Sequence, residues 1–71
     1  MKFSIGDTVT LEPAIFSSNP LAGRIGITIS QQGMGWWVFF PDYLNHGEPE
    51  YPDPIQRISW FLPEWSMDKV E

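Results

Sequence analysis

Proline and glycine interrupt this chain so often that they decide what it can fold into. Seven prolines and six glycines are spread over 71 residues, and no stretch between them reaches a dozen residues. Proline removes a backbone donor and ends a helix, and glycine weakens one. A helical bundle is therefore disfavoured, and the frequent breaks favour short strands joined by turns.

The length allows one small domain, spanning residues 1–71, with a single core. Because cysteine is absent, no disulfide or thiol nucleophile can form. Aromatic residues make up 15% of the chain, so large rings have to fill the core. No apolar run approaches the roughly 18 residues of a membrane span, and the first residues are unlike a signal peptide. We therefore expect a soluble, cytoplasmic protein without membrane contact.

Alternation of apolar and polar residues predicts an all-β chain of five short strands. The expected strands cover residues 5–11, 24–30, 36–40, 55–62 and 67–70, with a connection at 31–35 and a single tight helical turn at 63–66. Within 24–30, Ile25, Ile27 and Ile29 are expected to face the core. Gly26 is then expected on the other side, where it lets the strand bend.

The third expected strand, residues 36–40, is bulky at every position. Either Trp37 and Phe39 face the core, or Trp36, Val38 and Phe40 do. The other set must lie on a covered or functional surface. This excess of aromatic area is the first indication of a binding surface.

The net charge of −5 comes entirely from residues 40–71, because acids and bases balance in residues 1–39. Much of it lies in the long loop expected at 41–54, and loops of that length are usually functional or disordered. The four basic residues are too scattered to bind phosphates, so direct nucleic-acid binding is not expected. An acidic surface suits a basic partner protein, including one that itself binds nucleic acid.

Catalytic chemistry finds little support in the sequence. The chain has one histidine and no phosphate-cradling glycine loop, and no nucleophile has a visible base. His46, Glu48, Glu50 and Asp53 offer enough donors for a metal, yet a solvated acidic loop accounts for them more simply. We expect no enzyme activity, no metal and no cofactor.

Four segments carry a family resemblance: GDTVTL at 6–11, GRIGITI at 23–29, WWVFF at 36–40 and WFLPEWSMDKVE at 60–71. They resemble the pattern of bacterial and phage SH3-like small β-barrels. The resemblance implies a five-stranded SH3-like small barrel with a tight turn before the last strand. It implies no function, because such barrels serve as enzyme subunits, adaptors, inhibitors and nucleic-acid binders.

Acidity and surplus aromatics together predict a non-enzymatic protein-binding module, a small acidic inhibitor or adaptor acting on a basic partner. In one version its carboxylates imitate nucleic-acid phosphates. The residues expected to contact the partner are Trp36, Phe40, Asp42, Tyr43, Glu48, Glu50, Tyr51 and Asp53.

Three alternatives stay open. The second hypothesis is a structural or accessory subunit of a larger complex, whose aromatics are permanently covered. Likeness to eukaryotic peptide-binding SH3 domains would place Trp36 and Pro63 in a groove for proline-rich peptides. Stacking on tryptophan and tyrosine would suit single-stranded nucleic acid, against the charge.

Overall fold

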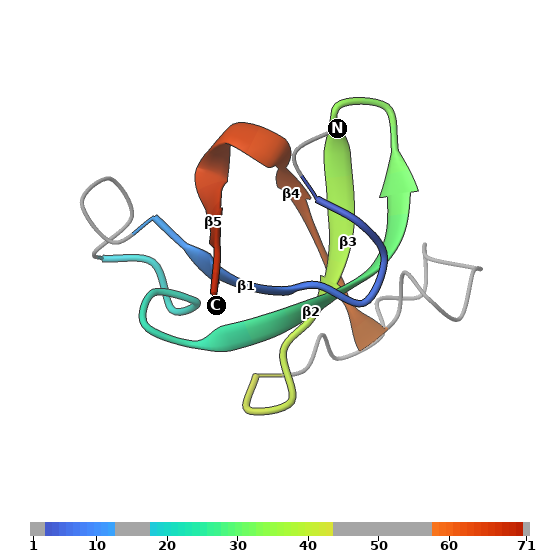
Figure 1. Cartoon of the computed structure of the whole chain (residues 1–71). Coiled ribbons are helices and arrows are strands. Elements are labelled where there is room, and N and C mark those ends of the chain that lie inside the picture. Colours follow the sequence, from blue (N-terminus) through green and yellow to red (C-terminus); the bar gives the residue numbers. More distant parts are fainter. Residues whose placement is uncertain (1–2, 13–17, 44–57, 71) are drawn as a thin grey trace.

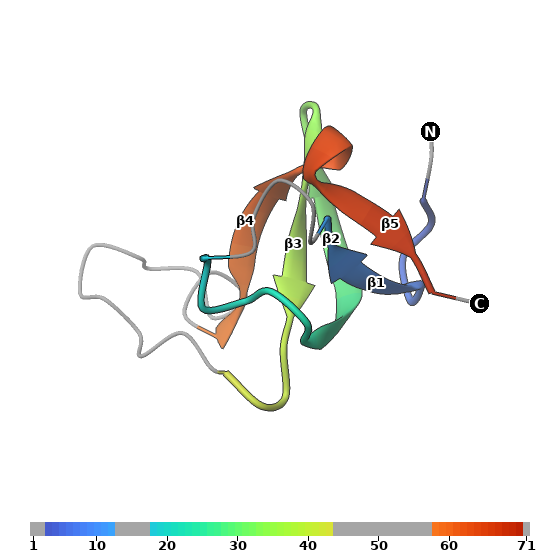
Figure 2. The same cartoon turned by 90° about the vertical axis from the view of Figure 1, so that its left-hand side faces the viewer.

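A computed structural model describes residues 3–12, 18–43 and 58–70 of the chain. The described part is all-β, with five antiparallel strands in one sheet of order β4-β3-β2-β1-β5. The elements are β1 (Thr8–Leu11), β2 (Ile25–Gln32), β3 (Gly35–Phe39), β4 (Trp60–Pro63), the 3-10 turn η1 (Glu64–Ser66) and β5 (Met67–Lys69). Figures 1 and 2 show that the sheet is strongly bent, and the long β2 is its central strand. The predicted all-β fold with one tight turn before the last strand is confirmed.

Strand limits differ from the prediction at three places. The strand expected at 55–62 begins only at Trp60, so the described residues Ile58 and Ser59 precede β4. The first strand begins at Thr8 instead of residue 5, because the chain turns at Gly6, which has φ 93°. The connection between β2 and β3 is tighter than the expected 31–35, since β2 continues to Gln32 and β3 starts at Gly35. Gly33 supports this hairpin with φ 58°, a left-handed conformation that glycine adopts without strain.

The predicted direction of β2 was wrong. Gly26 and Thr28 face the core and are buried, while Ile25 and Ile27 are 47% and 38% exposed. Ile29 is half-buried, next to a register shift between residues 28 and 30. The isoleucine side of β2 therefore faces away from the core over most of the strand.

Close packing between β2 and β3 explains this direction. A Cβ added at Gly26 would lie 2.5 Å from Cγ1 of Val38 and 2.9 Å from the Phe40 ring. No isoleucine fits at that position unless the two strands move apart. The same contact settles the open question for residues 36–40, because Trp36, Val38 and Phe40 are the buried set.

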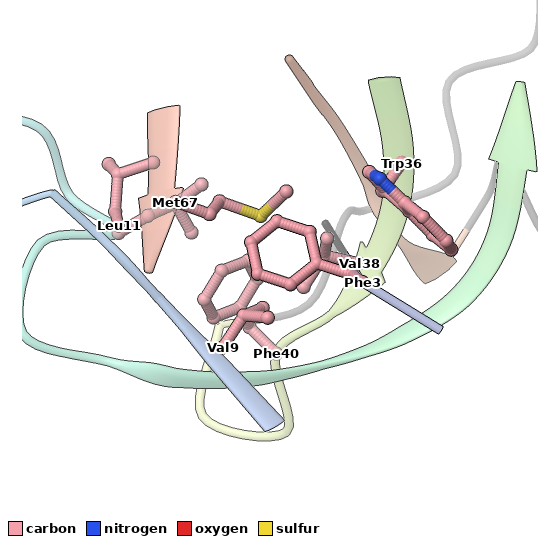
Figure 3. Close-up of a cluster of buried hydrophobic side chains, with 8 residues drawn as sticks. Phe3, Val9, Leu11, Trp36, Val38, Phe40 and Met67 are labelled. Carbon is pink, nitrogen blue, oxygen red and sulfur yellow. The ribbon is translucent and has the colours of Figure 1, made fainter. Parts of the chain in front are cut away.

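The core lies inside the bend of the sheet and draws side chains from β1, β3 and β5 and from the segments that flank the strands. It comprises Phe3, Val9, Leu11, Leu21, Trp36, Val38, Phe40 and Met67. Figure 3 shows the Phe3 ring among the side chains of the strands. Its centroid lies 6.1 Å from that of Trp36 in an edge-to-face arrangement. The segment before β1 thus closes one side of the core.

Candidate functional site

Large apolar side chains gather on the outside of β2, β3 and β4. Ile27 pairs with Phe39, and Trp37 pairs with Phe61. Directly paired residues project from the same face of a sheet, and so do residues two apart on one strand. Five residues therefore share the outside of the sheet, and we call them the outer apolar face: Ile25, Ile27, Trp37, Phe39 and Phe61.

The aromatic end of this face has a defined geometry. The rings of Trp37 and Phe61 lie 5.2 Å apart between centroids and are tilted by 59°. The indole Nε1 of Trp37 donates a hydrogen bond to Oε1 of Gln32 at 3.0 Å. The Phe61 ring lies against the backbone of Gly35, where any side chain would collide with it. Phe61 thus packs against the Gly35 backbone although it is 45% exposed.

Exposure distinguishes this face from the ordinary scatter of apolar surface residues. Ile25, Ile27 and Phe61 are each more than a third exposed, and Trp37 and Phe39 between them are half-buried. Contiguous apolar patches on small proteins mark interaction sites, and isolated exposed residues do not. Aromatic side chains at the centre of such a patch are typical energetic anchors of protein interfaces.

A second cluster stacks Arg24 on Tyr43 and Tyr43 on Trp60. The guanidinium carbon of Arg24 lies 4.9 Å from the Tyr43 ring centroid, and the Tyr43 and Trp60 rings are 5.7 Å apart. Trp60 Nε1 donates to the Tyr43 carbonyl at 2.9 Å. Arg24 also donates from Nε to the Pro20 carbonyl at 2.9 Å and from Nη1 to the Asp42 carbonyl at 3.2 Å. The cluster joins two loops to β4 and is mainly structural.

Two residues expected to contact a partner are instead core residues. Trp36 is 3% exposed and Phe40 is fully buried. Phe40 fills the space that Gly26 leaves open, and Phe3 covers Trp36. Trp36 also donates from Nε1 to Oε2 of Glu64 at 2.9 Å. Neither ring is presented to a partner, and Trp36 does not line an exposed groove.

Among the other expected contact residues, Asp42 is exposed and Tyr43 is half-buried. These two neighbours therefore lie together at the surface. The remaining four, Glu48, Glu50, Tyr51 and Asp53, lie outside the described residues. His46 lies there too. Within the described part of the chain, no three histidine, aspartate or glutamate side chains gather as a metal site would require.

Sequence reasoning left Trp37 and Phe39 as one of two options and missed the rest of the outer apolar face. A usable signal was present in β2, where small residues at 26 and 28 alternate with isoleucines. A strand that is bulky at every position packs most closely against a neighbour with small side chains. Considered together with the bulky segment 36–40, and not from β2 alone, Gly26 and Thr28 indicate which side of β2 faces the core.

Charges on the described residues are mostly negative. The acids are Asp7, Glu12, Asp42, Glu64 and Asp68, against the bases Arg24 and Lys69. Lys69 Nζ lies 3.8 Å from Oδ2 of Asp7, and Arg24 is engaged by carbonyls and the Tyr43 ring. The five residues of the outer apolar face carry no charge themselves.

Comparisons with known proteins assign no family: no protein-family model, curated protein or solved structure matches the chain. The resemblance to SH3-like small barrels therefore stays a prediction. In the described ranges, no helix has the length and apolar character needed to cross a membrane.

Proposed function

We propose that this chain is a non-enzymatic protein-binding module, a small acidic inhibitor or adaptor that docks on a basic partner protein. The observation that carries the proposal is the outer apolar face, where Phe61 stays 45% exposed beside the Trp37 ring. An uncharged aromatic patch on a chain of net charge −5 has the composition of an interface core.

The negative charge of the chain indicates that the partner surface is basic. The chain carries a net charge of −5, and an acidic protein associates faster and in a preferred orientation with a basic surface. In the nucleic-acid mimic version, the acids of residues 40–71 take the places of phosphates on the partner. A cytoplasmic location belongs to the same proposal.

A permanently assembled accessory subunit is the second candidate, and the same outer apolar face favours it. Obligate interfaces are more apolar than transient ones and depend less on charge. Salt therefore separates the two candidates, because screening weakens a steered, charged association much more than a buried apolar one.

The test uses the double variant Ile27→Thr/Phe61→Thr, since threonine suits a strand and removes the apolar side chains. Met34→Gln is the control, because Met34 is 90% exposed at the hairpin and lies off the outer apolar face. Immobilised chains are incubated with an extract of the source cells, and captured proteins are quantified by mass spectrometry at low and high salt.

Wild type and Met34→Gln should retain the same basic protein, and the double variant should retain at least ten times less. Elution by salt supports the inhibitor or adaptor. A stoichiometric complex that resists salt supports the accessory subunit. Equal capture by all three chains would contradict binding through the outer apolar face.

A further inference from the structure

The two edge strands of the sheet are protected to different degrees. Edge strands are usually protected by charged side chains, which prevent pairing with another chain. The β5 edge carries Asp68 and Lys69, whereas the four residues of β4 are Trp, Phe, Leu and Pro. Among the described strands, β4 is therefore the edge without charge protection.

Hydrogen-bond alternation shows which backbone groups of β4 face outward. The Glu64 N–H donates to the Met34 carbonyl at 3.0 Å, which places this pair in the hydrogen-bonded phase of the ladder between β3 and β4. In an antiparallel ladder that phase recurs at every second residue. Leu62 therefore bonds to β3, while Phe61 and Pro63 direct their backbone groups away from it.

Only one of these two outward residues offers both a donor and an acceptor. Pro63 has no N–H, and its carbonyl accepts a hydrogen bond from the Ser66 hydroxyl at 2.6 Å. Phe61 has an N–H and a carbonyl facing the edge, and its ring belongs to the outer apolar face. Backbone pairing and apolar contact thus coincide at Phe61.

Charge around the strand indicates what can pair there. Glu64 follows β4 directly, and its carboxylate accepts from Trp36. At the other end of β4, Trp60 contacts Tyr43, next to the exposed Asp42. Arg24 also lies at that end, bonded to carbonyls. The net charge of −5 opposes pairing with a second copy and favours a basic strand.

We infer that the partner of the proposed binding module supplies an extended segment with alternating basic and apolar residues, which adds as a further strand to the edge of β4. The inference rests on the proposed function and specifies the element that is recognised. The partner residue opposite Phe61 exchanges two hydrogen bonds with it and places an apolar side chain on the outer apolar face. Its neighbours place lysine or arginine near Glu64.

The test uses three synthetic eight-residue peptides with blocked ends. The first alternates valine and lysine, and the second alternates valine and glutamate. The third repeats the first with the backbone nitrogen of every valine methylated, because the valine opposite Phe61 is the residue that pairs with β4. Methylation removes the N–H donors on one edge but keeps the charge. Binding is followed by amide NMR titration at about 0.15 M salt, where long-range attraction is largely screened.

Strand addition predicts that the valine–lysine peptide binds at least ten times more tightly than either of the others. It also predicts that the Phe61 amide, which points away from β3, becomes protected on binding. The Leu62 amide, already bonded to β3, should change little. Phe61→Thr should weaken binding through the lost ring, whereas Met34→Gln should not.

Strand addition would be overturned if the valine–lysine peptide did not bind, if its methylated form bound equally well, or if the Phe61 amide stayed unprotected in the complex. Concentration-dependent protection of that amide without peptide would also overturn it, because a second copy would then occupy the edge. None of these results decides the proposed function, which fails only if the capture experiment shows no dependence on the outer apolar face.

Discussion

At Gly26, a single missing side chain sets the distance between β2 and β3. An added Cβ would lie 2.5 Å from Cγ1 of Val38, a buried atom without room to move. Overpacking of this kind usually costs about 1 to 3 kcal/mol, and we expect Gly26→Ala to lower the free energy of unfolding by that amount. Urea denaturation followed by tryptophan fluorescence measures the loss.

Gly35→Ala is the matched control for this prediction. Its added Cβ would collide with the Phe61 ring, but that ring is 45% exposed and can turn outward. The loss at Gly35 should therefore be smaller than the loss at Gly26. Equal losses would contradict the explanation of why β2 turns its isoleucines outward.

The hydroxyl of Thr28 is fully buried and fastens the segment before β1. It donates to the Ser4 carbonyl at 2.6 Å and accepts from the Asp7 N–H at 3.0 Å. Valine keeps the shape but leaves these groups with fewer partners, so Thr28→Val should destabilise the fold by about 1 to 3 kcal/mol. Amide exchange at Asp7 should accelerate in parallel.

Thr10→Val removes a comparable hydroxyl, which donates to the Arg24 carbonyl at 3.2 Å from a half-exposed position on β1. Water can replace that bond, so the loss should be well below the loss at Thr28. If both valine variants were equally stable, burial of the Thr28 hydroxyl would not be what holds this segment.

The turn η1 is fastened to the sheet from both of its ends. Glu64 accepts from the Trp36 indole and donates its N–H to the Met34 carbonyl, and the Ser66 carbonyl accepts from the Glu12 N–H at 2.8 Å. Glu64→Ala should lower stability by about 1 kcal/mol and speed exchange of the Trp36 indole proton. Glu64→Gln should preserve both, because its carboxamide oxygen still accepts. A Gln variant that behaves like Ala would show that charge, and not the hydrogen bond, fastens the turn.

At the level of elements, sequence alternation located all five strands but could not give the side of β2 that faces inward. A two-residue period fixes which residues share a face and leaves the direction of that face open. Hydrophobicity favoured Ile25 and Ile27 inside, yet the space beside Val38 admits only glycine. Packing between neighbouring strands, which no single-strand pattern contains, decided the direction.

The sequence predicted that an aromatic surface exists but did not identify the residues that form it. Surplus aromatics correctly predicted that some large rings lie outside the core, and Phe61 is 45% exposed. Trp36 and Phe40 were expected at the surface because all five residues of 36–40 are bulky. Alternation therefore could not show which of them face the core. The rings of β3 are divided between core and surface by contacts with Phe3 and Gly26, which lie far away in the sequence.

For the whole molecule, the net charge of −5 should act in opposite directions on folding and on binding. At about 0.01 M salt the screening length is near 30 Å, which exceeds the radius of gyration of 11.4 Å, so all like charges repel across the fold. Raising salt to about 0.15 M should therefore increase the free energy of unfolding. It should also weaken capture of a basic partner.

Asp42→Asn tests the common origin of both effects, because this exposed carboxylate is removed while the backbone carbonyl that holds Arg24 is kept. Both salt dependences should shrink in the variant, as measured by denaturation and by capture. Stability that falls with salt would instead mean that attractive pairs such as Lys69 with Asp7 dominate. That pair is half exposed at Lys69, where ion pairs contribute little, so repulsion should prevail.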